Sequence, residues 1–137
     1  MKTSKTVKTV ARVFIGCSAL SLLSVSVMAF FNPQSVMDLV QVKLNNTDAF
    51  SSIRGVYGGV GLTLFISLIY LMVKNVKQGL GLLSLLWGFY ALSRAITILV
   101  EGPLGSFGSQ WIVTELVLFV IAIILFILHT EPNYETK

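Results

Sequence analysis

The sequence predicts an all-α integral membrane protein, with four helices that cross the bilayer as an up-down-up-down bundle. Of its 137 residues, 55% are hydrophobic and only 12% are charged, well below the roughly one quarter that is typical of soluble domains. The apolar residues gather in runs at positions 10–31, 53–73, 80–100 and 111–129. Each run is close to the roughly 20 residues that span about 30 Å of hydrocarbon. We therefore expect residues 1–137 to form a single transmembrane domain.

The basic residues predict the orientation of the chain. Most of them lie before or at the start of the first run, or between the second and the third: Lys2, Lys5, Lys8, Arg12, Lys74 and Lys77. Cytoplasmic segments of membrane proteins carry such an excess of Lys and Arg, so both termini and the middle connection are expected in the cytoplasm. The net charge of +4 then reflects topology and contact with anionic membrane lipid, and we expect no nucleic acid as a partner.

The first run, 10–31, has the length of a retained span, although the tripeptide that ends at Ala29 also fits the cleavage pattern of a signal peptide. Its length exceeds the 7–15 apolar residues of a signal peptide, which favours retention. Ser18, Ser21 and Ser24 recur at every third position. Small residues at helical spacing let a neighbouring helix approach closely, so these serines predict a packing surface.

Two residues that often bind metals or carry redox chemistry, Cys17 and His129, are each the only one of their kind. One thiol cannot form an internal disulfide or a Cys-x-x-Cys relay. One histidine lacks the further ligands that a metal or haem site needs. We predict that Cys17 is a packing residue and that His129 lies at the membrane interface, and we expect no metal and no cofactor.

After the first span, Asn32 and Pro33 predict the start of another helix, with Asn32 as its N-cap and Pro33 at the first helical position. The apolar residues that follow repeat on one face: Val36, Met37, Val40 and Leu44. This pattern predicts a short amphipathic helix that lies on the outer, non-cytoplasmic surface of the membrane. It is either an ordinary interfacial helix or a lid over what the bundle encloses.

The second span opens with glycines at close spacing, and these predict a close helix–helix crossing. They are Gly55, Gly58, Gly59 and Gly61, of which Gly55 and Gly59 form a G-x-x-x-G pair. Glycine lowers helix propensity, so a packing role is the expected reason for its presence here. Arg54 is expected at the outer edge of this span, with Tyr57 one turn deeper on the same face. Arg54 either extends to the interface or joins a site inside the bundle.

The third span contains Arg94, a cation that is costly in lipid unless it has a partner. A short turn at 74–78 makes the second and third spans antiparallel neighbours. With a rise of 1.5 Å per residue, Arg94 lies about 21 Å beyond Leu80 and roughly 9 Å below the outer boundary. Helical spacing places it on one stripe with Trp87, Tyr90, Thr97 and Glu101.

The fourth span offers the expected partner of that cation. Trp111 marks the outer interface, and Glu115 follows it by four residues, about 6 Å deeper. The depths of Arg94 and Glu115 therefore agree within a few ångströms, and the two side chains are predicted to meet. The inner half of the spans offers almost no polar residues, which disfavours a channel or a pump.

Three functional hypotheses remain open for this charged cluster. In the first, Arg94 and Glu115 only lock the third and fourth spans together. In the second, Arg94 and Arg54 hold an anionic or carbonyl group of a ligand, while aromatic side chains enclose its apolar body. Those aromatic residues are Tyr57, Trp87 and Tyr90. In the third, a small membrane enzyme uses Glu115 or Glu101 as an acid or base on a lipid-like substrate.

No nucleophile, metal cluster or cofactor motif accompanies the carboxylates. We therefore favour a non-enzymatic binding or accessory role over a catalytic one. The expected partners are membrane lipid and either a small amphipathic ligand or another membrane protein.

Several short motifs resemble those of a known family. They are Arg54-Gly55-x-Tyr57-Gly58-Gly59, Ser93-Arg94, Glu101-Gly102-Pro103 and Glu115 early in the fourth span. Together they are similar to a family of small bacterial four-span membrane proteins that is catalogued only as a domain of unknown function. The resemblance covers nearly the whole chain and implies a multi-pass, four-helix protein of the bacterial inner membrane. It supplies no established activity, substrate or catalytic residue that could be transferred to this chain. A more distant likeness to the DoxX-like proteins is architectural and implies the four-helix fold alone.

Overall fold

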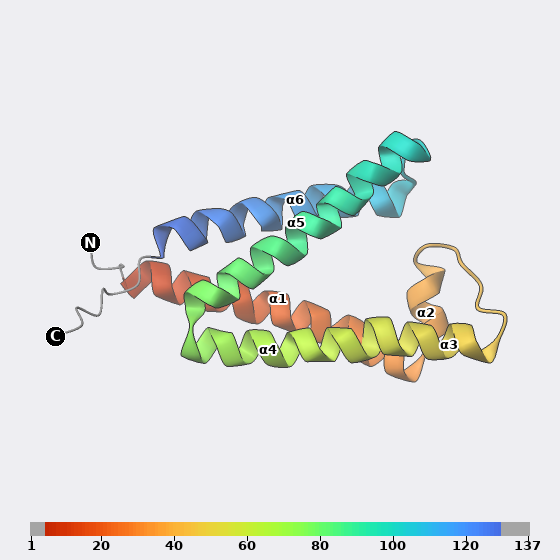
Figure 1. The fold of residues 1–137 in the computed structure, drawn as a ribbon, viewed down its shortest axis with the longest axis horizontal. Coiled ribbons are helices and arrows are strands. Elements are labelled where there is room, and N and C mark those ends of the chain that lie inside the picture. Colours follow the sequence, from red (N-terminus) through yellow and green to blue (C-terminus); the bar gives the residue numbers. More distant parts are fainter. Residues whose placement is uncertain (1–4, 130–137) are drawn as a thin grey trace. The chain divides into compact units, whose positions relative to one another are not determined.

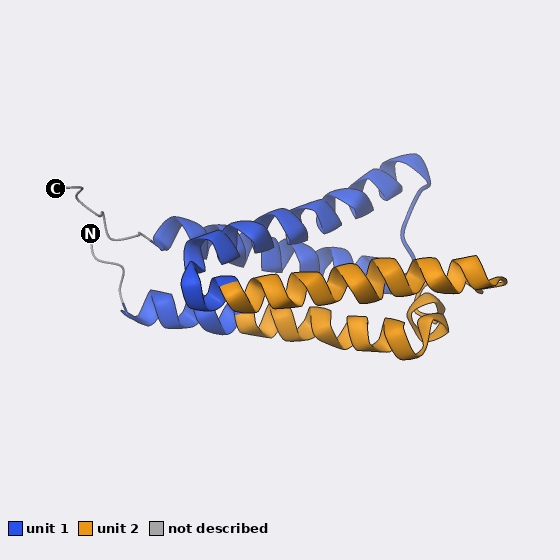
Figure 2. Ribbon diagram, turned by 60° about the horizontal axis from the view of Figure 1, so that its bottom comes forward, with its two compact units in different colours: residues 1–15, 71–137 blue, residues 16–70 orange. Residues whose placement is uncertain are grey.

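The computed structural model describes residues 5–129, and every regular element in that part of the chain is a helix (Figure 1). Four helical stretches are long and apolar enough to cross a membrane: Lys5–Phe31, Thr47–Lys74, Val76–Val100 and Ser106–Leu128. The predicted all-α membrane fold with four spans is thus confirmed. The chain forms two compact units, one of Met1–Ile15 with Leu71–Lys137 and one of Gly16–Tyr70 (Figure 2).

Each long helix begins several residues before its apolar run and ends within one residue of the predicted end. α1 (Lys5–Phe31) begins at residue 5 rather than 10, and α5 (Val76–Val100) at 76 rather than 80. α6 (Ser106–Leu128) begins at 106 rather than 111. Hydropathy detects only the part of a helix that lies in hydrocarbon, whereas hydrogen bonding and capping extend the helix beyond it. The helices therefore begin before the apolar runs, and the bounds of the membrane-spanning parts stay a prediction.

The predicted amphipathic helix is shorter than expected. α2 spans only Pro33–Asp38, with Pro33 at its first position, and the Asn32 side chain makes no capping hydrogen bond. Val36 and Met37 are buried with Ala29, but Val40 lies beyond the helix and is 49% exposed. Leu44 also lies beyond α2 and packs against this small cluster from the following segment. A helical face that runs from residue 36 to 44 was therefore the wrong prediction.

The side chain of Gln34 connects α2 to the segment that follows it. Its Nε2 donates hydrogen bonds to Asp38 Oδ1 at 2.7 Å and to the carbonyl oxygen of Val42 at 2.9 Å. Its Oε1 accepts from the backbone N–H of Leu44 at 2.9 Å. These bonds supply the partners that a continued helix would have supplied. The amide of Gln34, followed by the ammonium of Lys43 at 3.3 Å, holds the pKa of Asp38 below its ordinary value.

The second span is a continuous helical stretch with a π-helical segment inside it. α3 (Thr47–Ile53) follows its N-cap Asn46, whose Oδ1 accepts from the N–H of Ala49 at 2.8 Å. The π-helix η1 covers Arg54–Val60, and α4 (Gly61–Lys74) completes the span. π-helices are rare, and they occur where a side chain or a poor helix former disturbs the regular ladder. Here the segment is rich in glycine, and Ser26 Oγ lies 3.1 Å from the carbonyl oxygens of both Tyr57 and Gly58.

Only two of the four predicted packing glycines make a close approach. A Cβ on Gly58 would lie 3.1 Å from the ring of Phe30, and one on Gly61 would collide with Ser26 Oγ. Gly55 and Gly59 have open space where a Cβ would be. The close crossing inside Gly16–Tyr70 therefore uses Gly58 and Gly61, and the prediction was wrong for the G-x-x-x-G pair.

The serine stripe predicted on α1 is also only partly correct. Ser18 is buried, whereas Ser21 and Ser24 are exposed. Their hydroxyls donate to backbone carbonyl oxygens of the same helix, at Cys17 and Ser21. Cys17 is exposed rather than packed. The buried serine that contacts the second span is Ser26, which lies outside the three-residue repeat.

α5 and α6 form a helical hairpin within their unit. Asn75 alone separates α4 from α5, and its Oδ1 caps α5 by accepting from the N–H of Gln78 at 3.0 Å. The predicted turn at 74–78 is thus reduced to one residue. Two phenylalanines of α6 lie against two glycines of α5, Phe119 at Gly88 and Phe126 at Gly81. The two phenylalanines are seven residues apart on α6, and the two glycines are seven residues apart on α5. This is the repeat expected of helices packed side by side.

Candidate functional site

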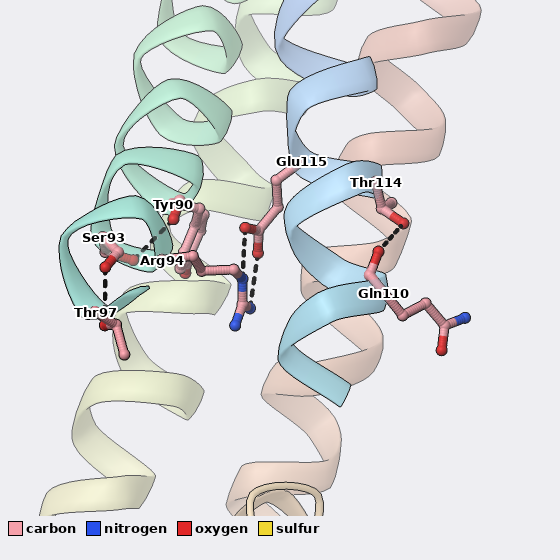
Figure 3. A network of polar contacts seen from close by, with 7 residues as sticks. All are labelled: Tyr90, Ser93, Arg94, Thr97, Gln110, Thr114 and Glu115. Carbon is pink, nitrogen blue, oxygen red and sulfur yellow. Dashed lines mark hydrogen bonds and ion pairs between the residues drawn. The ribbon is translucent and has the colours of Figure 1, made fainter. Parts of the chain in front are cut away.

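The site centres on an ion pair between Arg94 of α5 and Glu115 of α6 (Figure 3). Arg94 Nε donates to Glu115 Oε2 at 2.6 Å, and Arg94 Nη2 donates to Glu115 Oε1 at 2.9 Å. The Glu115 side chain is 3% exposed and the Arg94 side chain 22%. A planar guanidinium that meets both oxygens of one carboxylate is the strongest form of this interaction. The pairing predicted from the depths of the two residues is present.

Aromatic residues flank the guanidinium of Arg94. Its Cζ lies 6.0 Å from the centre of the Phe107 ring, and that ring lies 6.0 Å from the ring of Trp111. Phe107, Trp111 and Glu115 follow one another at four-residue spacing, so they share one face of α6. Phe107 was not predicted, because it lies before the apolar run. The spacing that leads from Glu115 back to Phe107 would have identified it.

Two aromatic residues of α5, Trp87 and Tyr90, precede Arg94 on the stripe predicted from helical spacing. The rings of Trp87 and Tyr90 lie 6.1 Å apart, and Tyr90 lies one helical turn before Arg94 on α5. Trp87 is 5% exposed, and its buried Nε1 has no hydrogen-bond partner among residues 5–129. A buried donor without a partner lowers stability. Trp87, Tyr90 and Arg94 therefore share one face of α5, as helical spacing predicted.

Glu101 does not join the cluster. It caps the C-terminal end of α5, where its backbone N–H donates to the carbonyl oxygen of Thr97 at 2.8 Å. Its side chain is exposed and forms no ion pair within the described part of the chain. The helix ends here because Gly102 has a φ of +105°, in the left-handed region that glycine tolerates. The prediction that Glu101 would share the site with Arg94 finds no contact in the structure.

Arg54 and Tyr57 belong to the other unit. Arg54 Nε donates to the carbonyl oxygen of Phe30 at the end of α1, at 3.1 Å. A cation is favourable there, because the last carbonyl groups of a helix carry partial negative charge. Tyr57 is 38% exposed. A ligand site shared by Arg54, Tyr57 and Arg94 stays a prediction.

The hydroxyl groups near the ion pair bond to their own helices. Ser93 Oγ donates to the carbonyl oxygen of Tyr90 at 2.8 Å, and Thr97 Oγ1 to that of Ser93 at 2.9 Å. On α6, Thr114 Oγ1 donates to the carbonyl oxygen of Gln110 at 3.1 Å (Figure 3). Such bonds satisfy the hydroxyl donors locally. The polar chemistry of the hairpin is therefore concentrated in Arg94 and Glu115.

Candidate metal ligands do not cluster in the described residues, where no group of three His, Cys, Asp or Glu side chains could hold an ion. His129 directly follows α6, the position predicted from the sequence, and it is 6% exposed. It is thus covered by protein rather than open to the surroundings.

The fold and the site define a small all-α membrane protein with an ion pair between two neighbouring spans. The chain belongs to the family described as Domain of unknown function (DUF4345), whose model matches residues 10–126. That range contains the motifs on which the resemblance to a family of unknown function was based, and the match confirms it. Searches of curated proteins and of solved structures found no match.

Proposed function

We propose that this protein is a non-enzymatic binding or accessory module of the bacterial inner membrane, with both termini in the cytoplasm. The observation that supports this proposal is the bidentate ion pair, in which Arg94 occupies both oxygens of the buried Glu115 carboxylate. Glu115 orients the guanidinium, and Arg94 presents its remaining amino group, Nη1, to a ligand or a partner.

The same contacts disfavour the enzymatic alternative. A general acid or base needs an oxygen within hydrogen-bond reach of the substrate. Both oxygens of Glu115 accept from Arg94, and the side chain is 3% exposed. Glu101 is exposed at the end of α5, apart from the aromatic stripe. Glu115 is thus paired and closed off from a substrate, and Glu101 lies outside the cluster that a substrate would contact.

The ion pair also indicates the chemistry of the ligand. Because Glu115 neutralises Arg94, the pair as a whole carries no net charge. A neutral acceptor, such as an ester or amide carbonyl oxygen, therefore suits Nη1 better than a free anion. Phe107 beside the guanidinium, and Tyr90 one turn before Arg94 on α5, suit an apolar neighbouring group. We infer a small amphipathic ligand or the apolar face of a membrane-protein partner.

The test is mass spectrometry of the small molecules and proteins that co-purify with the detergent-solubilised full chain. Wild type is compared with the double variant Arg94→Leu/Glu115→Leu, which removes both charges together and leaves no unpaired one. The matched control is Ser93→Leu/Thr114→Leu, which alters the neighbouring position on each helix, where the side chains bond only to their own helices.

A defined molecule present in wild type and in the control, but absent from the Arg94→Leu/Glu115→Leu variant, would support the proposal. If all three samples carry the same bulk lipid and no specific partner, the binding proposal fails. The ion pair would then serve only to fasten α5 to α6.

A further inference from the structure

An open cleft lies at the opposite end of the α5–α6 hairpin from the ion pair. It has a volume of about 410 Å³ and is lined by Asn75, Lys77, Gln78 and Phe126. Asn75 is the N-cap of α5, Lys77 and Gln78 lie in its first turn, and Phe126 lies in the last turn of α6. A volume of this size is within the usual range of roughly 300–1,000 Å³ for small-molecule sites.

Lys77 gives the cleft a positive charge over an apolar wall. Its Nζ lies 5.5 Å from the centre of the Phe126 ring, a cation–π geometry. Phe126 is fixed in turn by Gly81, where a Cβ would come within 3.4 Å of the ring. The first turn of α5 has no acidic residue, and Lys77 forms no ion pair within residues 5–129. Among the described residues, the ammonium group therefore contacts an aromatic ring rather than a carboxylate.

The length of α5 places this cleft at the depth of lipid headgroups. α5 has 25 residues, which corresponds to about 37 Å at 1.5 Å per residue, and the hydrocarbon layer measures about 30 Å. The ends of α5 therefore extend beyond the hydrocarbon. Lys77 is the second residue of α5, so its ammonium group reaches the polar region where lipid phosphates lie.

We propose that this cleft binds the phosphodiester headgroup of an anionic phospholipid. The ammonium group of Lys77 pairs with the phosphate, for which lysine acts as a compact point charge. The side-chain amides of Asn75 and Gln78 line the same cleft and supply hydrogen-bond donors for the phosphate and glycerol oxygens. The Phe126 ring packs against the glycerol and the first methylene groups. This site shares no residue with the Arg94–Glu115 pair, and its test does not depend on the function proposed above.

The experiment titrates the delipidated full chain in detergent with phosphatidylglycerol or phosphatidylcholine and counts bound lipids by native mass spectrometry. The test variant is Lys77→Gln. The matched control is Lys74→Gln, which removes the same charge three positions earlier, from an exposed side chain that does not line the cleft. We expect Lys77→Gln to weaken the tightest phosphatidylglycerol site about fivefold, which corresponds to about 1 kcal/mol for one basic residue near anionic lipid. Lys74→Gln should weaken it less than twofold.

Three outcomes would overturn the proposal. Equal weakening by Lys77→Gln and Lys74→Gln would show general attraction to charge. Equal binding of phosphatidylcholine would show that the anionic headgroup is not recognised. Displacement of the lipid by millimolar inorganic phosphate would assign the site to free phosphate. Circular dichroism of each variant verifies that the helical fold is retained, and Phe126→Leu provides a second variant that lowers binding without any change of charge.

Discussion

Replacing one partner of the Arg94–Glu115 pair should lower the free energy of unfolding. Replacing both should recover most of the stability that a single replacement loses. The pair contains two charge-assisted hydrogen bonds, at 2.6 and 2.9 Å. Each such bond contributes about 1.5–3 kcal/mol, and breaking one side of a buried ion pair costs about 3–5 kcal/mol. The measurement is reversible unfolding of the full chain in mixed micelles, with helicity followed by circular dichroism.

Arg94→Leu should lower the free energy of unfolding more than Glu115→Leu, because Glu115 is the more deeply buried of the two residues. Arg94→Leu leaves Glu115, 3% exposed, as an unpaired carboxylate in the interior, and should cost about 3 kcal/mol or more. Glu115→Leu leaves Arg94, 22% exposed, whose long side chain can turn toward the interface, and should cost about 2 kcal/mol. The double variant replaces the pair by apolar groups of similar size, which is often nearly neutral.

The control is Ser93→Leu/Thr114→Leu, at positions whose hydroxyls bond to their own helices. It should change stability by less than about 0.5 kcal/mol. If the loss in the Arg94→Leu/Glu115→Leu double variant equals the sum of the two single losses, the residues are not coupled. That result would refute the reasoning, including the role of Glu115 as the group that orients Arg94.

Two further predictions concern the unit Gly16–Tyr70. Gly61→Ala should destabilise the fold by about 1–3 kcal/mol, because the new Cβ collides with Ser26 Oγ. Gly59→Ala meets open space and should stabilise it by up to about 1 kcal/mol through helix propensity; equal effects in micelle unfolding would contradict this packing. The lowered pKa of Asp38, caused first by the hydrogen bond from Gln34, stabilises the loop after α2 at pH values above the ordinary carboxyl pKa of about 3.9. That contribution is lost as the pH falls through the lower pKa of the folded state, so backbone amide chemical shifts of the loop should stay constant from pH 7 to 5 and change only below about pH 4.

The spans and the ion pair could be predicted from the sequence because each depends on one length. Hydrocarbon thickness determines how many apolar residues a span needs. The rise of the α-helix, counted from two separate boundaries, places Arg94 and Glu115 at similar depth. Such estimates need no knowledge of neighbouring side chains. They fail for Glu101, because the glycine that ends α5 leaves its side chain outside the helix pair.

The packing of the second span could not be predicted in the same way. Helical projection assumes 3.6 residues per turn, but η1 is a π-helix over Arg54–Val60 with i→i+5 hydrogen bonding. The wider turn changes which glycines face α1, so Gly58 and Gly61 pack while the G-x-x-x-G pair remains open. The network around Gln34 follows no period at all. A periodic analysis of the sequence has no means of detecting it.

The position of the ion pair also has a consequence for the biogenesis of the protein. A charged residue within the hydrocarbon opposes membrane insertion, by as much as about 2.5–3.5 kcal/mol at the centre of a span, and Arg94 and Glu115 place one such charge in each of α5 and α6. Only five residues, 101–105, connect these helices, so both charges can be neutralised as soon as the second helix leaves the ribosome. We expect α5 and α6 to enter the bilayer together. A nascent chain stalled after Val100 should hold α5 in the membrane less firmly than one extended beyond Leu128, and equal retention would exclude this order of insertion.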